Sequence, residues 1–168
     1  LITHTYTVTV TGADDPATLG AVTPATIAEV DQSATTTDAG LGGTLVGADG
    51  DVETLTYGID GGAPGSAGTV TKAGTFGTLA VTTASGAYTF TKNTAAIEAL
   101  DVGEGGTDTF TMTVGDGDGS PVTQTFTVTV TGADDPATLG TVTPATIAEV
   151  DQSATTTDAG LAGTLVGA

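Results

Sequence analysis

One block of sequence occurs twice in this chain, and it constrains the fold more than any other feature. Residues 1–48 return at 121–168, displaced by 120 positions, and 42 of the 48 aligned positions are identical. The six differences are mild: Leu1/Pro121, Ile2/Val122, His4/Gln124, Tyr6/Phe126, Ala21/Thr141 and Gly42/Ala162. A solenoid unit has about 20–50 residues and a whole domain about 100–150. The spacing therefore predicts a tandem array of near-identical domains.

The repeat divides the chain into three parts. We expect residues 1–13 to be the last strand of a preceding repeat, residues 14–133 to form one complete module, and residues 134–168 to open the following repeat. An array that copies one unit gains length or valency, whereas an active site needs only one copy. The repeat thus favours a spacer over an enzyme, and neighbouring identical repeats in the same chain are the first expected partners.

Alternating apolar residues predict the fold class. Phe126, Val128 and Val130 alternate with threonine, and residues 110–114 follow the same scheme, as burial of one strand face requires. We expect further strands at 25–30, 43–46, 53–59, 76–82 and 86–91, and a short helix at 93–100 capped by Asn93. About seven strands in each module predict an all-β protein, a Greek-key β-sandwich.

Composition excludes several classes of function. The chain has 20 Asp and Glu against two Lys, a net charge of −18, and no Cys or Trp. Nucleic acid and anionic membrane surfaces are excluded as natural partners, because phosphate binding requires clustered Lys and Arg. No apolar run approaches the 18 or so residues that membrane insertion requires. The sole histidine, His4, is Gln124 in the second copy, and no phosphate loop, zinc spacing or nucleophile elbow occurs, so we expect no enzyme.

Carboxylates gather at predicted strand ends and not along strand faces. The groups are Asp14 with Asp15, Glu29 with Asp31, Asp49 with Asp51 and Glu53, Asp101 with Glu104, Asp116 with Asp118, and Asp134 with Asp135. Two like charges about 4 Å apart repel by roughly 4 kcal/mol at an effective dielectric of 20, and two lysines cannot neutralise these groups. Ca²⁺ accepts carboxylate and carbonyl oxygens in flexible loops, whereas Mg²⁺ demands stricter geometry. We therefore predict Ca²⁺ as the cofactor and these residues as its ligands.

Two plainer interpretations compete with calcium binding. Asp-Gly pairs are ordinary turn formers in water. Acidic surfaces also occur in salt-adapted proteins, where charge maintains solubility. The salt-adapted case predicts carboxylates on exposed strand faces, but those positions carry threonine here.

Residues 100–136 resemble a known family. The segments LDVGE at 100–104, TDTFTMTV at 107–114, GDGDG at 115–119 and FTVTVTGADDP at 126–136 are similar to VCBS-type and bacterial cadherin-like repeats, which form the extender regions of giant RTX adhesins. The resemblance implies an Ig/cadherin-like sandwich stiffened by calcium. It also implies type I secretion, an extracellular position at the cell surface, and a role in cell adhesion and biofilm formation as a spacer below a terminal adhesive domain.

The resemblance also implies that calcium ions lie largely at module junctions. Carried onto this sequence, the junction after the central module would use Asp134, Asp135, Asp116, Asp118, Asp101 and Glu104, with Glu149 and Asp151 of the next module. The earlier junction would use Asp14, Asp15, Glu29 and Asp31. Family linkers often read Asn-Asp, whereas this linker reads Asp-Asp. Without Ca²⁺ the linker would be a charged hinge, and the chain would fold only after leaving a calcium-poor cytoplasm.

Two other functions stay open at this point. The threonines that alternate along residues 3–11 and 123–131 present hydroxyl and methyl groups, so the module could itself bind a glycan, a surface or ice. Exposed strand edges could also pair between chains, which would make the module a subunit of a self-assembling extracellular filament.

Overall fold

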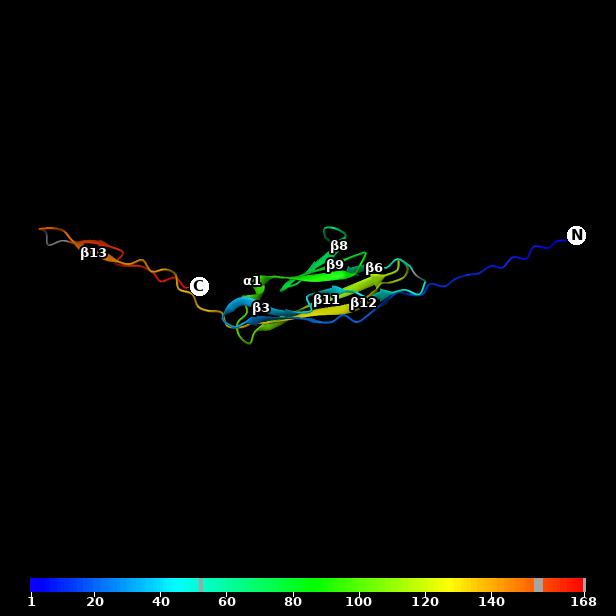
Figure 1. Cartoon of the computed structure of the whole chain (residues 1–168), viewed down its shortest axis with the longest axis horizontal. Helices are drawn as coiled ribbons and strands as arrows, with labels where there is room; N and C mark the ends of the chain where they lie inside the picture. The colour runs from blue at the N-terminus through cyan, green and yellow to red at the C-terminus, as the bar shows by residue number, and fades with distance from the viewer. Residues whose placement is uncertain (52, 153–155, 168) are drawn as a thin grey trace. The chain divides into compact units, whose positions relative to one another are not determined.

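Two five-stranded β-sheets hold most of the strands in the part of the chain that the structure describes. The computed structural model describes residues 1–51, 53–152 and 156–167. It divides into two compact units, Leu1–Asp134 and Asp135–Ala168. In the first unit one sheet has the order β3-β2-β12-β11-β6 and the other β4-β10-β9-β8-β7, while β1 pairs with β5. Figure 1 shows β8 and β9 on one side of this unit and β11 and β12 on the other. The strands of this unit are β1 (Thr18–Leu19), β2 (Ala25–Val30), β3 (Ser33–Ala39), β4 (Gly42–Thr44), β5 (Gly47–Ala48), β6 (Thr56–Ile59), β7 (Ala63–Pro64), β8 (Thr69–Ala73), β9 (Gly77–Thr82), β10 (Ala87–Lys92), β11 (Gly105–Gly115) and β12 (Val122–Thr131).

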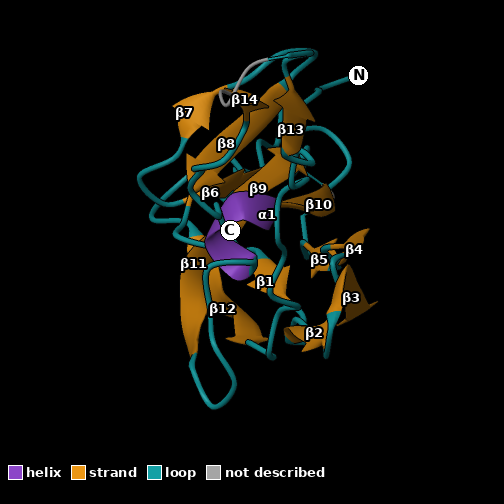
Figure 2. Ribbon diagram, turned by 90° about the vertical axis from the view of Figure 1, so that its left-hand side faces the viewer, coloured by secondary structure: helices purple, strands orange, loops and turns teal. Residues whose placement is uncertain are grey.

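The two sheets pack face to face around one apolar core, and Figure 2 shows β8, β9 and β10 on one side and β11, β12 and β2 on the other. The ring of Phe126 in β12 lies 5.3 Å from that of Tyr88 in β10, and the rings of Phe110 and Phe90 lie 6.0 Å apart, both pairs edge to face. Such pairs contribute about 0.5–1.5 kcal/mol each beyond the burial of their area. The predicted all-β sandwich is therefore confirmed, and its core lies where the alternation placed it.

The strand predictions succeed where one face of a strand is apolar and buried. The strand predicted at 25–30 is β2, and those predicted at 76–82 and 86–91 match β9 and β10 to within one residue. Of the region 43–46, only residues 43 and 44 lie in a strand, β4, and β5 begins after it at Gly47. The expectation of about seven strands is wrong, because twelve are described in the first unit. β3 was not predicted, since its sequence SATTTDA has no large apolar residue and it is an edge strand.

The predicted helix exists but is shorter than expected. α1 spans Thr94–Ile97, and Ile97 is fully buried against the core. Asn93 precedes it but makes no side-chain capping bond. Its Nδ2 instead donates to the carbonyl oxygen of Thr75 at 3.3 Å, so Asn93 occupies the predicted N-cap position but does not cap the helix through its side chain. Among the described residues, no helix has the length and apolar character needed to cross a membrane.

Residues 1–17 lie outside every strand of the described chain, although alternation predicts a strand from residue 3 to residue 11. Tyr6, Val8 and Val10 are between 66% and 89% exposed. Their copies in β12 are buried, because β12 pairs with β11 on one side and with β2 on the other. Among the described residues, 1–13 has no such neighbouring strands, so the alternating pattern finds no surface to pack against.

The second unit repeats local pairings of the first. It contains β13 (Thr146–Glu149) and β14 (Thr156–Ala159). Ile147 pairs with Asp158 in this hairpin as Ile27 pairs with Asp38 between β2 and β3. The local sequence therefore sets this register without the other strands of a sandwich.

A buried carboxylate joins the two sheets of the first unit. Asp108 in β11 is 5% exposed. Its Oδ1 accepts a hydrogen bond from the backbone N–H of Thr75 and its Oδ2 one from that of Phe76, both at 2.8 Å. These two residues lie in the turn between β8 and β9. Gly74 is needed beside them, because a Cβ there would lie 2.3 Å from the carboxylate.

Candidate metal centre

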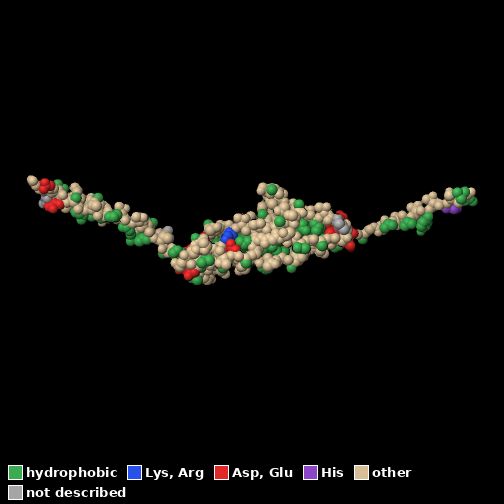
Figure 3. All heavy atoms as spheres, in the orientation of Figure 1, with side chains coloured by type: hydrophobic (Ala, Val, Ile, Leu, Met, Phe, Trp, Pro, Cys, Tyr) green, Lys and Arg blue, Asp and Glu red, His purple; other side chains and the backbone are tan. Residues whose placement is uncertain are grey.

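The structure separates the predicted ligands of the first unit into two groups. The β11–β12 pairing runs from Val114 opposite Val122 to Gly105 opposite Thr131, so the loop at 116–121 and residues 132–134 lie at opposite ends of this ladder. At about 3.4 Å per residue these ends are roughly 30 Å apart. Figure 3 shows acidic side chains at both ends of the sandwich on the displayed face. We call one set the loop cluster (Asp14, Asp15, Asp49, Asp51, Glu53, Asp116 and Asp118) and the other the linker group (Glu29, Asp31, Asp101, Glu104 and Asp134).

Carboxylate-to-backbone hydrogen bonds hold the three segments of the loop cluster together. Asp116 Oδ2 accepts from the N–H of Ala17 at 2.7 Å, across 99 residues of sequence. Asp51 Oδ2 accepts from the N–H of Asp15 at 2.9 Å. Asp49 Oδ1 accepts from the N–H of Asp51 at 2.8 Å and closes the turn after β5. Asp49, Asp51 and Asp116 thus accept hydrogen bonds through their carboxylates, and Asp15 donates one of these bonds through its backbone N–H.

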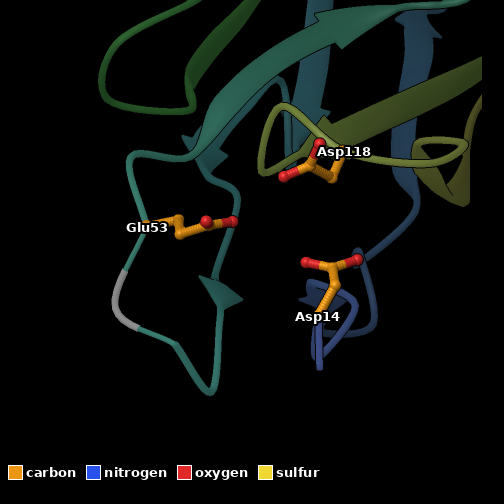
Figure 4. A group of neighbouring side chains, drawn as sticks. All are labelled: Asp14, Glu53 and Asp118. Atoms are coloured by element: carbon orange, nitrogen blue, oxygen red, sulfur yellow. The ribbon is translucent and has the colours of Figure 1, made fainter. Parts of the chain in front are cut away.

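The three remaining carboxylates converge on one another. Asp14, Glu53 and Asp118 come from three different segments, and one carboxylate oxygen of each lies within 4.8 Å of the other two. Figure 4 shows the three side chains directed toward a common space. All three are exposed, so an ion from solvent reaches them without any rearrangement of the core. This is the geometry of an oxygen-rich site for a hard cation.

Repulsion within the loop cluster is visible in the pKa values. Partial desolvation raises the pKa of Asp14, and neighbouring carboxylates, with Asp116 the strongest, raise it further. Partial desolvation and the charge of Asp118 likewise raise the pKa of Glu53. By contrast, the backbone N–H of Ala17 lowers the pKa of Asp116 and outweighs its desolvation. Asp116 is therefore stabilised as an anion by the protein itself, whereas ionised Asp14 and Glu53 gain from an added positive charge.

The protein's own cations do not neutralise the loop cluster. Lys92 Nζ lies 2.6 Å from Asp38 Oδ2 in a cross-sheet ion pair and also bonds to Thr36. Lys72 Nζ donates to the carbonyl oxygen of Asp60 at 2.8 Å. These are the only two Lys or Arg residues in the sequence.

One carboxylate oxygen of the loop cluster is buried without a partner. Asp49 Oδ2 accepts no hydrogen bond from the described residues.

The linker group surrounds the last residues of the first unit. Glu29 is 8% exposed, and its Oε2 accepts from the N–H of Ala133 at 3.0 Å, while its Oε1 is buried without a hydrogen bond from described residues. Gln32 Nε2 donates to Asp134 Oδ2 at 2.5 Å. Glu104 Oε2 accepts from the N–H of Asp101 at 3.0 Å, and its carbonyl accepts from the N–H of Gly132. Asp31 is exposed beside Gln32.

The structure corrects the expected grouping of ligands. The sequence-based assignment places Asp116 and Asp118 with Asp134, but they lie beside Asp14 at the other end of the sandwich. It also places Glu29 and Asp31 with Asp14. Glu29 instead contacts Ala133, because β2 runs parallel to β12 and both strands end at the same side. Asp101 and Glu104 do lie with Asp134, as expected.

The remaining predicted ligands belong to the second unit. Asp135 is its first residue and is exposed. Glu149 ends β13 and Asp151 lies in the turn that follows, and both are exposed. They repeat Glu29 and Asp31, which lie at the far end of the complete module from Asp14.

Sequence reasoning named every member of the loop cluster but missed the buried Asp108. A usable signal existed, because Asp108 precedes Phe110 by two residues and so lies on the same strand face as Phe110 and Met112. A carboxylate on the apolar face of a strand indicates a buried acceptor with backbone partners.

Comparisons with known proteins add no family to this description. Neither the protein-family models nor the curated proteins include a match to the chain.

Proposed function

We propose that this chain is part of the structural extender of a large secreted adhesin at the cell surface, in which Ca²⁺ stiffens tandem sandwiches that project a terminal adhesive domain. The observation that carries the proposal is the convergence of Asp14, Glu53 and Asp118 within 4.8 Å. Ca²⁺ binds oxygens at 2.3–2.6 Å, so two ligands on opposite sides of one ion are about 4.6–5.2 Å apart. The observed spacing fits such an ion.

The position of Asp14 links ion binding to stiffness. Asp14 lies in the ADDP segment at the expected boundary between successive modules, whereas Glu53 and Asp118 lie in loops of the module. An ion held by all three fixes the start of the linker against two loops of the sandwich. Without the ion, partial desolvation and the neighbouring carboxylates both raise the pKa values of Asp14 and Glu53, so their charged forms are unfavourable. The linker is then free to bend, and the array behaves as a chain of hinged bodies.

Because residues 134 and 135 repeat residues 14 and 15, the same two positions serve successive modules. Gln32 of the complete module holds the carboxylate of Asp134. In the next copy, Asp134 corresponds to the metal ligand Asp14. We infer that each linker is anchored by an amide from the module that it leaves and by a bound ion in the module that it enters.

Thermal unfolding of the full chain tests the calcium site. Extracellular Ca²⁺ sites have dissociation constants of about 10⁻⁴–10⁻³ M, so about 2 mM Ca²⁺ stabilises the folded state by about 0.7–1.8 kcal/mol per site. We expect a higher unfolding midpoint in Ca²⁺ than in EDTA, followed by circular dichroism. The same midpoint in both would contradict the proposal.

Two variants separate ion binding from a structural role of the carboxylates. Asp118→Asn removes the negative charge of one ligand, so it should weaken Ca²⁺ binding and reduce the calcium-dependent rise in midpoint. In EDTA it should be at least as stable as the wild type, because one repulsive charge is gone. Asp60→Asn removes an exposed carboxylate outside the loop cluster and should leave the rise unchanged. Destabilisation of Asp118→Asn in EDTA would show that this carboxylate acts within the protein and not on an ion.

A further inference from the structure

The two five-stranded sheets have four outer strands, and β3 is the longest of them. β3 has seven residues, whereas β6 has four, β4 three and β7 two. β7 also contains Pro64, and the backbone N–H of Tyr57 in β6 donates to the carbonyl oxygen of Thr83 at 2.9 Å. Among the described residues β3 pairs with β2 alone, and Figure 2 shows it at the margin of its layer. A long open edge can pair with a strand of another chain.

The composition of β3 does not protect this edge. Natural edge strands avoid pairing by being short or by carrying Lys or Pro, and β3 has neither residue type. Its centre is the threonine run 35–37, and threonine is enriched in strands. Its single charged residue, Asp38, forms an ion pair with Lys92 Nζ at 2.6 Å. β3 and its ion-pair partner together carry no net charge.

The charge of the chain favours antiparallel pairing at this edge. A net charge of −18 keeps copies of the chain apart wherever their carboxylates face one another. The linker group precedes β3 directly in the chain, so it lies at one end of the edge. When two copies pair antiparallel, their linker groups lie at opposite ends of the joined edge, more than about 20 Å apart and beyond the Debye length at physiological salt.

A second copy of β3 fits this edge without placing like charges opposite each other. The same edge of two copies can continue one sheet only around a two-fold axis normal to that sheet, which makes the two strands antiparallel. All seven residues find a partner when Thr36 faces Thr36 of the second copy. Thr35 then faces Thr37, and Asp38 faces Ala34. Threonine pairs directly opposite each other across two strands are stabilising.

A groove beside the edge has room for side chains of the added strand. Its volume is about 310 Å³, and it is lined by β3, α1 and the end of β10: Ala34, Thr35, Thr36, Lys92, Thr94, Ile97 and Glu98. Lys92 bonds to Thr36 and Asp38, which alternate along β3 and so share this face with Ala34. Asp38 of the second copy, opposite Ala34, therefore lies on the side of the groove that holds Lys92. Pockets for alternate side chains are what strand addition requires.

We propose that β3 is a self-association edge, at which β3 of a second copy pairs antiparallel around Thr36 and joins two five-stranded sheets into one. The pairing goes beyond the spacer function and does not depend on calcium binding. Because the two copies run in opposite directions, the pair suits chains that project from two facing cells. That last consequence alone rests on the proposed function.

Sedimentation equilibrium of the full chain, from about 10 μM to 1 mM at one fixed Ca²⁺ concentration and about 0.15 M NaCl, measures the pairing. We expect a dimer whose fraction rises with concentration. Thr35→Lys/Thr37→Lys places lysine opposite lysine twice across the joined edge, so it should raise the dissociation constant about tenfold or more. Thr107→Lys/Thr109→Lys is the matched control, with the same spacing and charge at exposed threonines of β11, and it should not weaken the dimer.

A charge swap tests the register. Thr35→Glu/Thr37→Glu alone should also weaken the dimer, but mixed with Thr35→Lys/Thr37→Lys it places glutamate opposite lysine and should restore association. Thr35 and Thr37 are exposed, so both variants should keep the unfolding midpoint of the wild type. A wild-type chain that stays monomeric at every concentration would overturn the proposal. So would equal weakening by the β3 and β11 variants, or a mixture that associates no better than either variant alone.

Discussion

Replacing Asp108 by alanine should destabilise the sandwich more than any other change of a single carboxylate. Asp108 is 5% exposed and accepts two backbone hydrogen bonds at 2.8 Å, from Thr75 and Phe76. A hydrogen bond to a charged group contributes about 1.5–3 kcal/mol. Both donors would lose their acceptor in Asp108→Ala, and the donor of Phe76 is buried, so we expect a loss of about 3–5 kcal/mol.

Urea unfolding followed by circular dichroism, at one fixed Ca²⁺ concentration, measures this loss. Asp108→Asn keeps one acceptor oxygen but turns an N–H toward the other donor, so it should cost about half as much. Gly74→Ala should also be destabilising, because its Cβ would lie 2.3 Å from the carboxylate. Asp60→Ala, at an exposed position, should stay within about 0.5 kcal/mol of the wild type. A loss below about 1 kcal/mol for Asp108→Ala would refute the idea that this carboxylate joins the two sheets.

The remaining predictions concern the loop cluster. The folded-state pKa values of Asp14 and Glu53 are raised above 3.8 and 4.5, so the folded state holds these protons more tightly than the unfolded state. In EDTA they therefore favour folding at low pH, and that contribution is lost as pH rises through the folded-state values. Glu53→Gln should make the unfolding midpoint fall less steeply as the pH rises above about 4.5, and an unchanged slope would contradict the raised pKa. In a protein with several tandem copies, small-angle X-ray scattering should show a longer and straighter particle in Ca²⁺ than in EDTA. Equal bending in both would argue against a spacer stiffened by calcium.

The sequence was sufficient for the parts of the fold that local alternation encodes. Phe126, Val128 and Val130 define the buried face of β12, and Leu79 and Val81 that of β9. It was insufficient for β3, whose threonines carry no apolar face because the strand lies at a sheet edge. Period-two patterning reports burial on one side, so an edge strand exposed on most of its surface leaves no such signal.

The candidate ligands followed from residue type and loop position, but their grouping did not. Whether Glu29 lies near Asp14 or near Ala133 depends on the direction of β2 relative to β12. That pairing is parallel and joins strands about 100 residues apart in sequence. No local pattern encodes the direction. For the same reason Asp116 lies with Ala17, although Asp134 is much nearer to it in sequence.

A crystal of the chain grown with about 10 mM CaCl₂ and measured for anomalous scattering tests the central claim most directly. The account predicts an anomalous peak between Asp14, Glu53 and Asp118, with carboxylate oxygens at about 2.3–2.6 Å from it. Well-ordered loops whose three carboxylates point apart, with no peak between them, would contradict it.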